Sequence, residues 1–171
     1  AVFIAALFSI PLLGLRLSDA VSVLNETVSS LSKPLITISS VLGFAYLVNN
    51  SGMSLTLAGV IAGSGAWFPL LSPIIGWLGV FITGSDTSSN ALFGKVQHDA
   101  ALSTGMPPVV AVGANVSGGV VGKMISPQSV AVAAAAGGLP GKESDLFRFT
   151  VLHSFIMLAV ICLITLLQSL I

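Results

Sequence analysis

Apolar residues dominate the chain, and short polar stretches divide them into a series of predicted helices. A helix that crosses a membrane needs about 20 consecutive apolar residues. Segments 34–48 and 54–71 are candidates for such spans, and 149–171 is the clearest one. The apolar run 1–15 is shorter, so we expect it to be the end of a helix and the chain to be the C-terminal part of a longer protein.

One segment carries an apolar stripe instead of a continuous apolar run. Around residues 18–33, apolar side chains recur at intervals of four and three, which places them on one face of a helix. They are Leu17, Val21, Leu24, Val28 and Leu31. We expect this helix to end at Lys33-Pro34, because proline cannot donate the next hydrogen bond. The pattern fits an amphipathic helix that lies along the membrane interface, and equally a loop helix that packs on protein.

A polar stretch then interrupts the apolar sequence. Residues 83–90, Thr-Gly-Ser-Asp-Thr-Ser-Ser-Asn, contain five hydroxyl groups, one acid and one amide. The arm before them, 72–82, has 11 residues and reaches across about half of a ~30 Å hydrocarbon core. Together with the arm after them, 90–102, it predicts a re-entrant hairpin that enters the membrane and returns to the same side. Two short helices outside the membrane are the alternative.

Segment 106–138 is too long for one straight span and contains internal polar residues. Proline disfavours helical backbone at the residue before it, and serine followed by proline fits the first positions of a new helix. We therefore predict a discontinuous transmembrane helix that breaks at Ser126-Pro127, resumes to about Gly137, and is terminated by residues 137–141. A separate G-x-x-x-G at Gly59 and Gly63 permits a close helix contact, or reflects only the tolerance of membrane helices for glycine.

The composition places these helices in a membrane. Mean hydropathy is +1.03 and 7% of the residues are charged, whereas soluble domains have about 25%. The net charge of zero argues against nucleic-acid binding. Cys162 is the single cysteine, so we expect no disulfide and no cysteine metal pair, and we predict no cofactor and no metal.

Enzyme motifs do not occur at the necessary spacings. Gly122-Lys123 resembles the end of a phosphate-binding loop, but Ser117 stands where the first glycine belongs and Met124 replaces the hydroxyl residue. The chain has no G-x-S-x-G and no H-E-x-x-H. We therefore predict that the protein is not an enzyme.

The polar stretch is a candidate binding site, because polar, irregular backbone persists at membrane depth only where protein or a water-filled cavity surrounds it. Ser85, Asp86 or Ser88 can cap the arm that follows, and Ser126 can cap the second half of the discontinuous helix. Two helix N-termini aimed at one cavity would bind a small anion, and the nearby hydroxyls and amides suit a carboxylate with a neighbouring hydroxyl. The candidate substrate-binding residues are Thr83, Ser85, Thr87, Ser88, Ser89, Asn90, Asn115, Ser126, Gln128 and Ser129.

Three ionisable residues are candidates for proton coupling. Asp86 lies at the predicted tip, where ionisable groups are expensive and usually functional, although a helix cap is the alternative role. Lys123 precedes the break and could offset the charge of a substrate or of Asp86, or could extend to the interface. His153, near the start of the last span, could relay a proton. We expect His98 to be a solvated loop residue.

At these positions the chain resembles the L-lactate permease family. Residues 76–81 together with 83–94 are similar to its most distinctive segment, residues 117–129 to a second one, and residues 145–150 precede the final helix as they do in that family. The resemblance covers nearly the whole chain. Because family members are considerably longer, it identifies this chain as roughly their C-terminal third.

The resemblance implies a multi-pass protein of the bacterial plasma (inner) membrane that imports L-lactate, glycolate or similar 2-hydroxy acids by proton symport. The family is placed in a wider ion transporter superfamily with inverted repeats. The implied fold is therefore an all-α polytopic membrane protein with a re-entrant helical hairpin and a discontinuous transmembrane helix, one half of an inverted-repeat transporter. Related dicarboxylate carriers have Ser-Asn-Thr at their hairpin tips, whereas Ser89-Asn90 is followed here by Ala91, which fits proton coupling better than a Na⁺ site of that type.

We expect partial scaffold helices over 1–71, a transport part over 72–138 and the final span over 149–171, with the transport part moving past the scaffold in an elevator-type cycle. The expected partners are L-lactate, protons, the lipid bilayer and the N-terminal remainder of the same protein, and a homodimer is possible. The alternatives are a Na⁺-coupled carboxylate carrier and a non-transporting membrane scaffold subunit.

Overall fold

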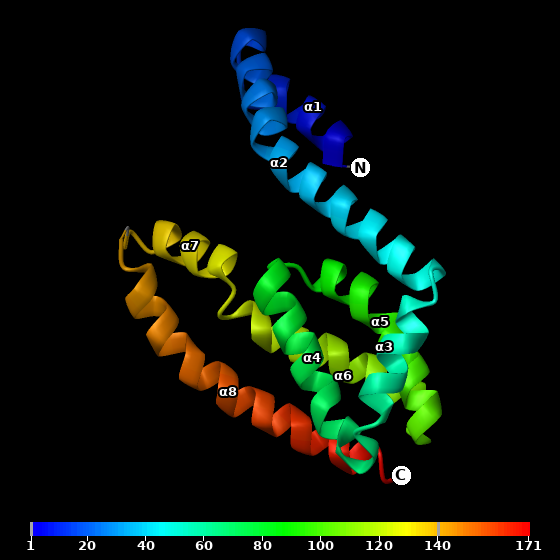
Figure 1. Cartoon of the computed structure of the whole chain (residues 1–171). Coiled ribbons are helices and arrows are strands. Elements are labelled where there is room, and N and C mark those ends of the chain that lie inside the picture. The colour runs from blue at the N-terminus through cyan, green and yellow to red at the C-terminus, as the bar shows by residue number, and fades with distance from the viewer. Residues whose placement is uncertain (1, 140) are drawn as a thin grey trace. The chain divides into compact units, whose positions relative to one another are not determined.

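The computed structural model describes residues 2–139 and 141–171 of the chain, and the regular structure in these ranges is helical (Figure 1). Ala1 and Pro140, which belong to the predicted first helix and to the predicted terminator at 137–141, lie outside the described residues. The elements in chain order are α1 (Val2–Leu12), α2 (Leu17–Asn50), α3 (Met53–Ala62), the 3₁₀ turn η1 (Gly65–Trp67), α4 (Phe68–Thr83), α5 (Asp86–Thr104), α6 (Pro108–Lys123), α7 (Pro127–Ala136) and α8 (Glu143–Gln168).

The chain divides into two compact units, residues 1–40 and 41–171. The first unit contains α1 and the beginning of α2, which continues without interruption to Asn50. The predicted helix end at Lys33-Pro34 is therefore wrong, because a proline removes only one backbone hydrogen bond from a helix of 34 residues. The predicted stripe side chains Leu17, Val21, Leu24 and Val28 are exposed within this unit, so the interfacial position of 18–33 stays a prediction.

The second unit begins differently from the sequence prediction. The expected span 54–71 is wrong: α3 ends at Ala62, and α4 starts at Phe68 after Gly63, Ser64 and the short turn η1. Glycines favour a break here, and Pro69 fits the first turn of α4 because that turn needs no N–H donor there. Helix α4 therefore has 16 residues instead of the 11 predicted for the first hairpin arm.

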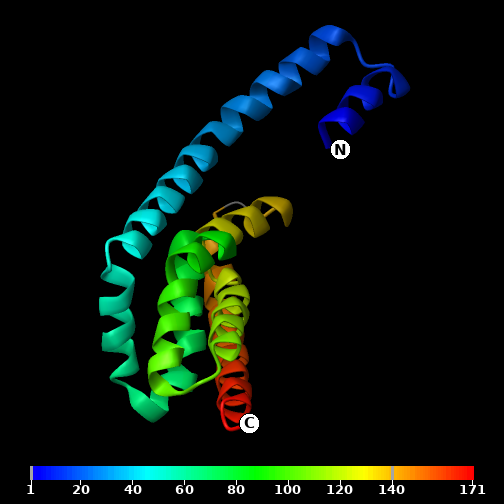
Figure 2. The ribbon, with the colours of Figure 1, turned by 90° about the vertical axis from the view of Figure 1, so that its right-hand side faces the viewer.

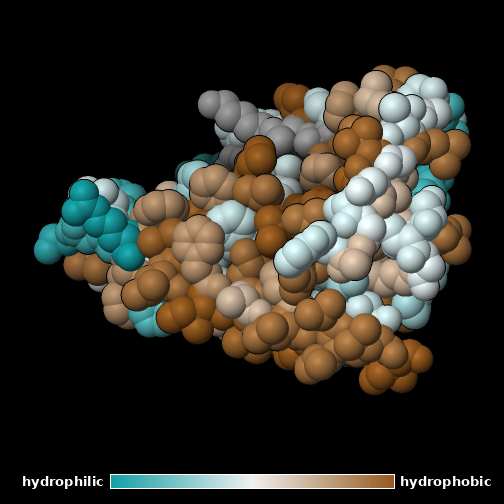
Figure 3. Space-filling view, turned by 60° about the horizontal axis from the view of Figure 1, so that its bottom comes forward, coloured by the Kyte–Doolittle hydropathy of each residue, from teal (hydrophilic) through white to brown (hydrophobic). Residues whose placement is uncertain are grey.

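Two stretches of the described chain are long and apolar enough to cross a membrane, Gly65–Thr83 and Glu143–Gln168. The pair Pro108–Lys123 and Pro127–Ala134, bent by 40°, would form a third as one broken span. This confirms the predicted break at Ser126-Pro127, and α8 begins at Glu143 instead of residue 149. Figure 3 shows a face on which hydrophobic side chains predominate, as expected for a membrane protein.

Helices α4, α5, α6 and α8 lie side by side (Figure 2), and α6 packs most extensively against α4. The two backbones approach closely because glycines line the contact. A Cβ atom at Gly118 would overlap the carbonyl oxygen of Pro73, and one at Gly122 would overlap that of Trp77. Around Gly59, by contrast, a Cβ would meet no described atom within 4 Å, so the predicted G-x-x-x-G makes no close helix contact with the described part of the chain.

Helix α8 is joined to this pair by polar as well as apolar contacts. The indole Nε1 of Trp77 in α4 donates a hydrogen bond of 2.8 Å to Ser154 Oγ in α8, which itself donates to the carbonyl of Val121 in α6 at 3.0 Å. Trp77 also packs with Leu158 and Ile125 in one buried apolar cluster. Helices α4, α6 and α8 thus form one packed block. The end of α4 and the start of α5, and the end of α6 and the start of α7, lie at its edge.

Candidate functional site

The hairpin tip is a two-residue turn between α4 and α5. Gly84 ends α4 with a φ of +67°, a conformation that glycine adopts without strain. Ser85 caps α5, because its Oγ accepts a hydrogen bond of 3.3 Å from the backbone N–H of Ser88. The hydroxyl of Thr83 lies 3.0 Å from the carbonyl oxygen of Ser85 and accepts from the Ser85 N–H at 3.2 Å. Residues 86–90 therefore form the first turns of a helix, and the expectation of irregular backbone there is wrong.

The break between α6 and α7 is capped in the same way. Ser126 is fully buried, and its Oγ accepts a hydrogen bond of 3.3 Å from the backbone N–H of Ser129. The hydroxyls of Ser126 and Ser129 lie 2.9 Å apart. The predicted capping role of Ser126 is therefore confirmed. Pro127 has no N–H and the Ser129 N–H is bonded to Ser126, so the Gln128 N–H is the amide that the first turn of α7 can offer to a ligand.

The tip and the break contact each other at Gly84. Lys123 Nζ donates a hydrogen bond to the carbonyl oxygen of Gly84, where its charge compensates the negative end of α4. The side-chain Oε1 of Gln128, in the first turn of α7, lies 2.7 Å from the position that a Cβ of Gly84 would take. Because Ser85 follows Gly84 directly, the structure brings the starts of α5 and α7 and the ammonium group of Lys123 to one junction.

Asp86 lies in the first turn of α5 and faces α6. Its Oδ2 accepts a hydrogen bond of 3.0 Å from Asn90 Nδ2. Its Oδ1 is buried, lies 2.5 Å from the position of a Cβ at Gly119, and has no hydrogen-bond partner among the described residues. The Oγ of Ser89 is also buried and has no partner within the same part of the chain. A buried polar atom without a partner is costly, so Asp86 Oδ1 and Ser89 Oγ are the two atoms at this site that call for an explanation.

Buried amides continue from Asp86 into the helical block. Asn90 Oδ1 accepts from Asn115 Nδ2 at 2.6 Å, and Asn115 Oδ1 accepts from Gln97 Nε2 at 2.7 Å. Gln97 Nε2 also donates to the backbone carbonyl of Ser72 at 3.0 Å, and the Ser72 hydroxyl donates to Gln97 Oε1. Gln97, Asn115 and Ser72 are fully buried. The chain of bonds thus joins α5, α6 and α4.

Gln97 and Ser72 were not among the residues predicted for the site. The signal for Gln97 was its spacing, because residues 86, 90 and 97 lie on one face of a helix and all three carry polar side chains in this chain. Ser72 had no comparable signal, since it was taken as the first residue of a short arm and only the tertiary contact of α4 with α5 shows its partner.

The remaining predicted residues differ in exposure and in their contacts. Thr87 and Gln128 are exposed, whereas Asn90 and Asn115 are tied into the buried chain of amides. The exposed ring of His153 stacks on Phe149 and its Nδ1 lies 2.8 Å from the carbonyl oxygen of Phe149 in its own helix. No described contact joins His153 to the junction, so its role as a proton relay stays a prediction.

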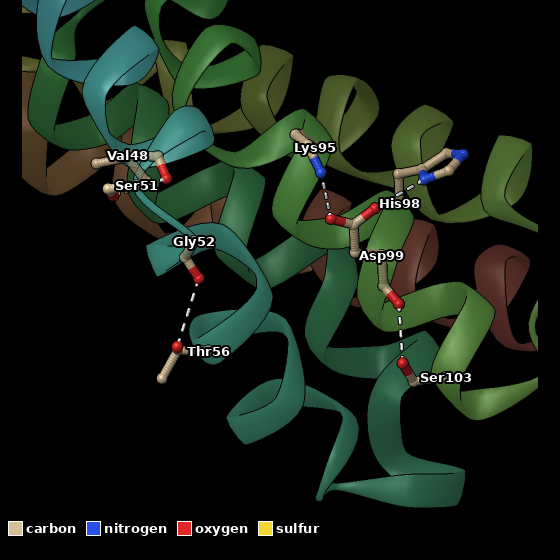
Figure 4. Close-up of polar contacts among 8 residues, drawn as sticks. All are labelled: Val48, Ser51, Gly52, Thr56, Lys95, His98, Asp99 and Ser103. Carbon is tan, nitrogen blue, oxygen red and sulfur yellow. Dashed lines mark hydrogen bonds and ion pairs between the residues drawn. The ribbon is translucent and has the colours of Figure 1, made fainter.

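A second polar cluster lies on α5 away from the junction (Figure 4). Lys95 Nζ donates to Asp99 at 2.6 Å, and His98 Nδ1 lies 3.2 Å from the other carboxylate oxygen. The hydrogen bond from Lys95 holds the pKa of Asp99 below its ordinary value. Lys95 and His98 are exposed. His98 was expected to be exposed and in a loop, and the second part is wrong because it lies within α5.

Comparison with known proteins identifies similar chains. A sequence model of the L-lactate permease family matches residues 1–171. The chain is 58% identical over 168 residues to an L-lactate permease of Bacillus subtilis (strain 168), which covers 98% of this chain and 30% of that protein. It is 56% identical over 169 residues to the glycolate permease GlcA of Escherichia coli (strain K12), covering 99% and 30% of the two chains. The L-lactate permease of the same strain is 53% identical over 169 residues, with 99% and 31% covered. No solved structure matches the chain.

Proposed function

Because the chain belongs to the L-lactate permease family, we propose that it is part of a secondary active transporter that imports L-lactate, glycolate or similar 2-hydroxy monocarboxylates with a proton across the bacterial plasma membrane. The relatives are named L-lactate and glycolate permeases, which indicates a transporter and not an enzyme. The chain spans about 30% of the length of these relatives, so the transport cycle belongs to the longer protein.

The substrate carboxylate binds at the junction around Gly84. The N-terminal turns of α5 and α7 each contribute a partial positive charge, α7 offers the backbone N–H of Gln128, and the Lys123 ammonium lies beside them. Thr87 and Gln128 are exposed at these two turns and would hydrogen-bond the 2-hydroxyl and one carboxylate oxygen. Neutral donors suit a substrate that must also be released, because they bind an anion less tightly than an arginine pair would.

The observation that carries proton coupling is the buried Asp86 Oδ1, which has no partner among the described residues. A negative Asp86 in the first turn of α5 would repel a lactate anion at the same helix start. Protonation of Oδ1 removes that charge, so proton and lactate binding would favour each other, and this mutual effect is thermodynamically reciprocal. The proton and the anion would then move together without net charge.

The close α4–α6 contact supports the elevator-type movement that we propose. Helices that touch through glycines at backbone distance cannot slide past one another without separating, so α4, α5 and α6 would move as one rigid body. The hairpin tip and the break would keep their relative positions during such a movement. The substrate site would thus travel intact past helices supplied by the rest of the protein.

The test is uptake of labelled L-lactate by the full-length transporter in proteoliposomes with an imposed pH gradient. Wild type should accumulate lactate above equilibrium only when the outside is more acidic. Asp86→Asn should exchange lactate but equilibrate it, because the amide cannot take up the coupled proton. Equal accumulation by both proteins would remove Asp86 from the coupling step and leave it as a structural residue.

Two alternatives are separated by the same assay. A Na⁺-coupled carboxylate carrier would lose uptake when choline replaces Na⁺ at a fixed pH gradient, whereas a proton symporter would not. A non-transporting scaffold subunit would tolerate alanine at Asp86, Asn90 and Gln128 without a change in uptake. The observation against a scaffold role is the polar junction itself, which buries an unpaired acid oxygen where packing alone would favour an apolar residue.

A further inference from the structure

The hydrogen bonds that connect Asp86 to the interior have a direction. A backbone carbonyl can only accept, and the carbonyl of Ser72 accepts from Gln97 Nε2 at 3.0 Å. Gln97 Nε2 uses its second proton on Asn115 Oδ1 at 2.7 Å. Because Gln97 must turn its amino group toward the Ser72 carbonyl, it presents a donor and never an acceptor to Asn115.

This direction passes from one amide to the next. Asn115 receives a proton at Oδ1, so its Nδ2 faces Asn90 and donates to Asn90 Oδ1 at 2.6 Å. Asn90 is thereby oriented with its own Nδ2 toward Asp86 Oδ2, at 3.0 Å. Reversing any one amide would oppose two acceptors or two donors. Gln97 and Asn115 are fully buried and Asn90 is half-buried, and a buried group left unsatisfied costs about 1–3 kcal/mol.

From this chain of bonds we infer that Gln97 is a positioning residue for Asp86, and that it fixes which oxygen takes the proton and how readily. The inference rests on the proposed function only where it assumes that this proton is the one transported with lactate. Asn90 Nδ2 is a donor, so it stabilises the charged carboxylate and occupies Oδ2, and the proton must bind at the unpartnered Oδ1. Gln97 achieves this from a distance, through Asn115 and Asn90, without contact to Asp86.

Few other charges act on Asp86 from the helices around it. Helices α4, α6 and α7 carry a single titratable side chain, Lys123, which donates to the Gly84 carbonyl close by. The other titratable residues of α5 are Lys95, His98 and Asp99, which form their own cluster on its solvated face. The orientation of the Asn90 amide is therefore the main local variable that a substitution of Gln97 would change.

The experiment is an infrared titration of Asp86 in the full-length transporter, reconstituted in lipid and labelled with ¹³C in the aspartate side chains. The band of Asp86 is assigned by its loss in Asp86→Asn. Gln97→Leu keeps the side-chain volume close to the original but removes the donor, so Asn115 and Asn90 are free to rotate. We expect Asp86 to take up its proton at a higher pH than in wild type, since the oriented donor bond from Asn90 to the carboxylate is weakened.

Three variants make the result specific. Asn115→Ala cuts the chain one residue nearer to Asp86 and should shift the midpoint in the same direction, even where Gln97→Leu does not fold. Ser72→Ala leaves the backbone carbonyl that orients Gln97 and should leave the midpoint within about 0.3 units of wild type. Val96→Ala removes buried volume beside Gln97 in a different apolar cluster, and should also leave the midpoint unchanged although it destabilises the protein.

The outcomes separate this inference from the proposed function. A raised midpoint in Gln97→Leu or Asn115→Ala, with Val96→Ala unchanged, supports it, whether or not the pH profile of lactate uptake follows. If uptake does not follow, the inference stands and the coupling role of Asp86 fails. The inference is overturned if a folded Gln97→Leu or Asn115→Ala keeps the wild-type midpoint, or if Val96→Ala shifts it equally. It is also overturned if Asp86 keeps one protonation state from pH 4 to 10 in every variant.

Discussion

The contact between α4 and α6 can be tested by a single added methyl group. A Cβ at Gly118 would overlap the backbone carbonyl oxygen of Pro73, which cannot rotate away as the end of a flexible side chain could. The helices must separate to accommodate Gly118→Ala, and overpacking of this kind costs typically 1–3 kcal/mol. Because the obstacle is backbone, we expect about 3 kcal/mol, seen as a lower melting temperature of the full-length protein.

Gly113→Ala is the matched control, because it makes the same chemical change in the same helix. A Cβ at Gly113 would meet nothing within 4 Å. In a helix interior alanine is favoured over glycine by about 0.5–1 kcal/mol, so this variant should melt at the wild-type temperature or slightly above. Both variants of the full-length protein would be followed by thermal unfolding in detergent. Equal melting temperatures for Gly118→Ala and Gly113→Ala would refute the close backbone contact.

Three further predictions follow from other contacts. Trp77→Phe removes the indole hydrogen bond to Ser154 at 2.8 Å and should destabilise the protein by about 1–2 kcal/mol, measured as a lower melting temperature, whereas a wild-type value would show that α8 is not held there. Lys123→Gln should raise the apparent KM for lactate uptake roughly tenfold, because the positive charge that Lys123 holds beside Gly84 is lost, and Lys123→Arg should restore part of the affinity if the charge is what matters. Lys95→Ala should cost under about 0.5 kcal/mol because the pair is exposed. The pKa of Asp99 is lowered in the folded protein, so this small contribution should be present above the ordinary aspartate pKa and disappear as the pH falls through the lowered value, which a stability–pH profile of Lys95→Ala against wild type would show.

Local chemistry explains why some features were predictable. The break at Ser126-Pro127 and the cap by Ser126 follow from the backbone limits of proline and from the capping ability of a serine hydroxyl, which need no distant partner. The start of α5 at the polar stretch follows from Ser85 in the same way. The helix end at Pro34 was predicted by the same rule and was wrong, because a long helix can include one proline when its remaining hydrogen bonds are intact.

Spacing alone could not decide which glycines touch another helix. Gly59 and Gly63 have the same four-residue interval as Gly118 and Gly122, yet among the described residues only the second pair lies against the backbone of another helix. The interval determines that two glycines share a face, whereas the fold determines which face is covered. The same limit applies to Ser72, whose partner Gln97 is 25 residues away and on another helix.

By itself the sequence determined the membrane character, the helical content, the two capped helix starts and, through its long motifs, the family. These properties depend on composition and on neighbouring residues, so they can be inferred from the chain in one dimension. Only the tertiary structure decided that both helix starts meet at Gly84, that Asp86 Oδ1 is buried beside Gly119, and that Asn90, Asn115 and Gln97 form one oriented chain. Those contacts join residues from 18 positions apart (97 and 115) to 44 positions apart (84 and 128), and glycines help to form them by letting α4 and α6 approach to backbone distance.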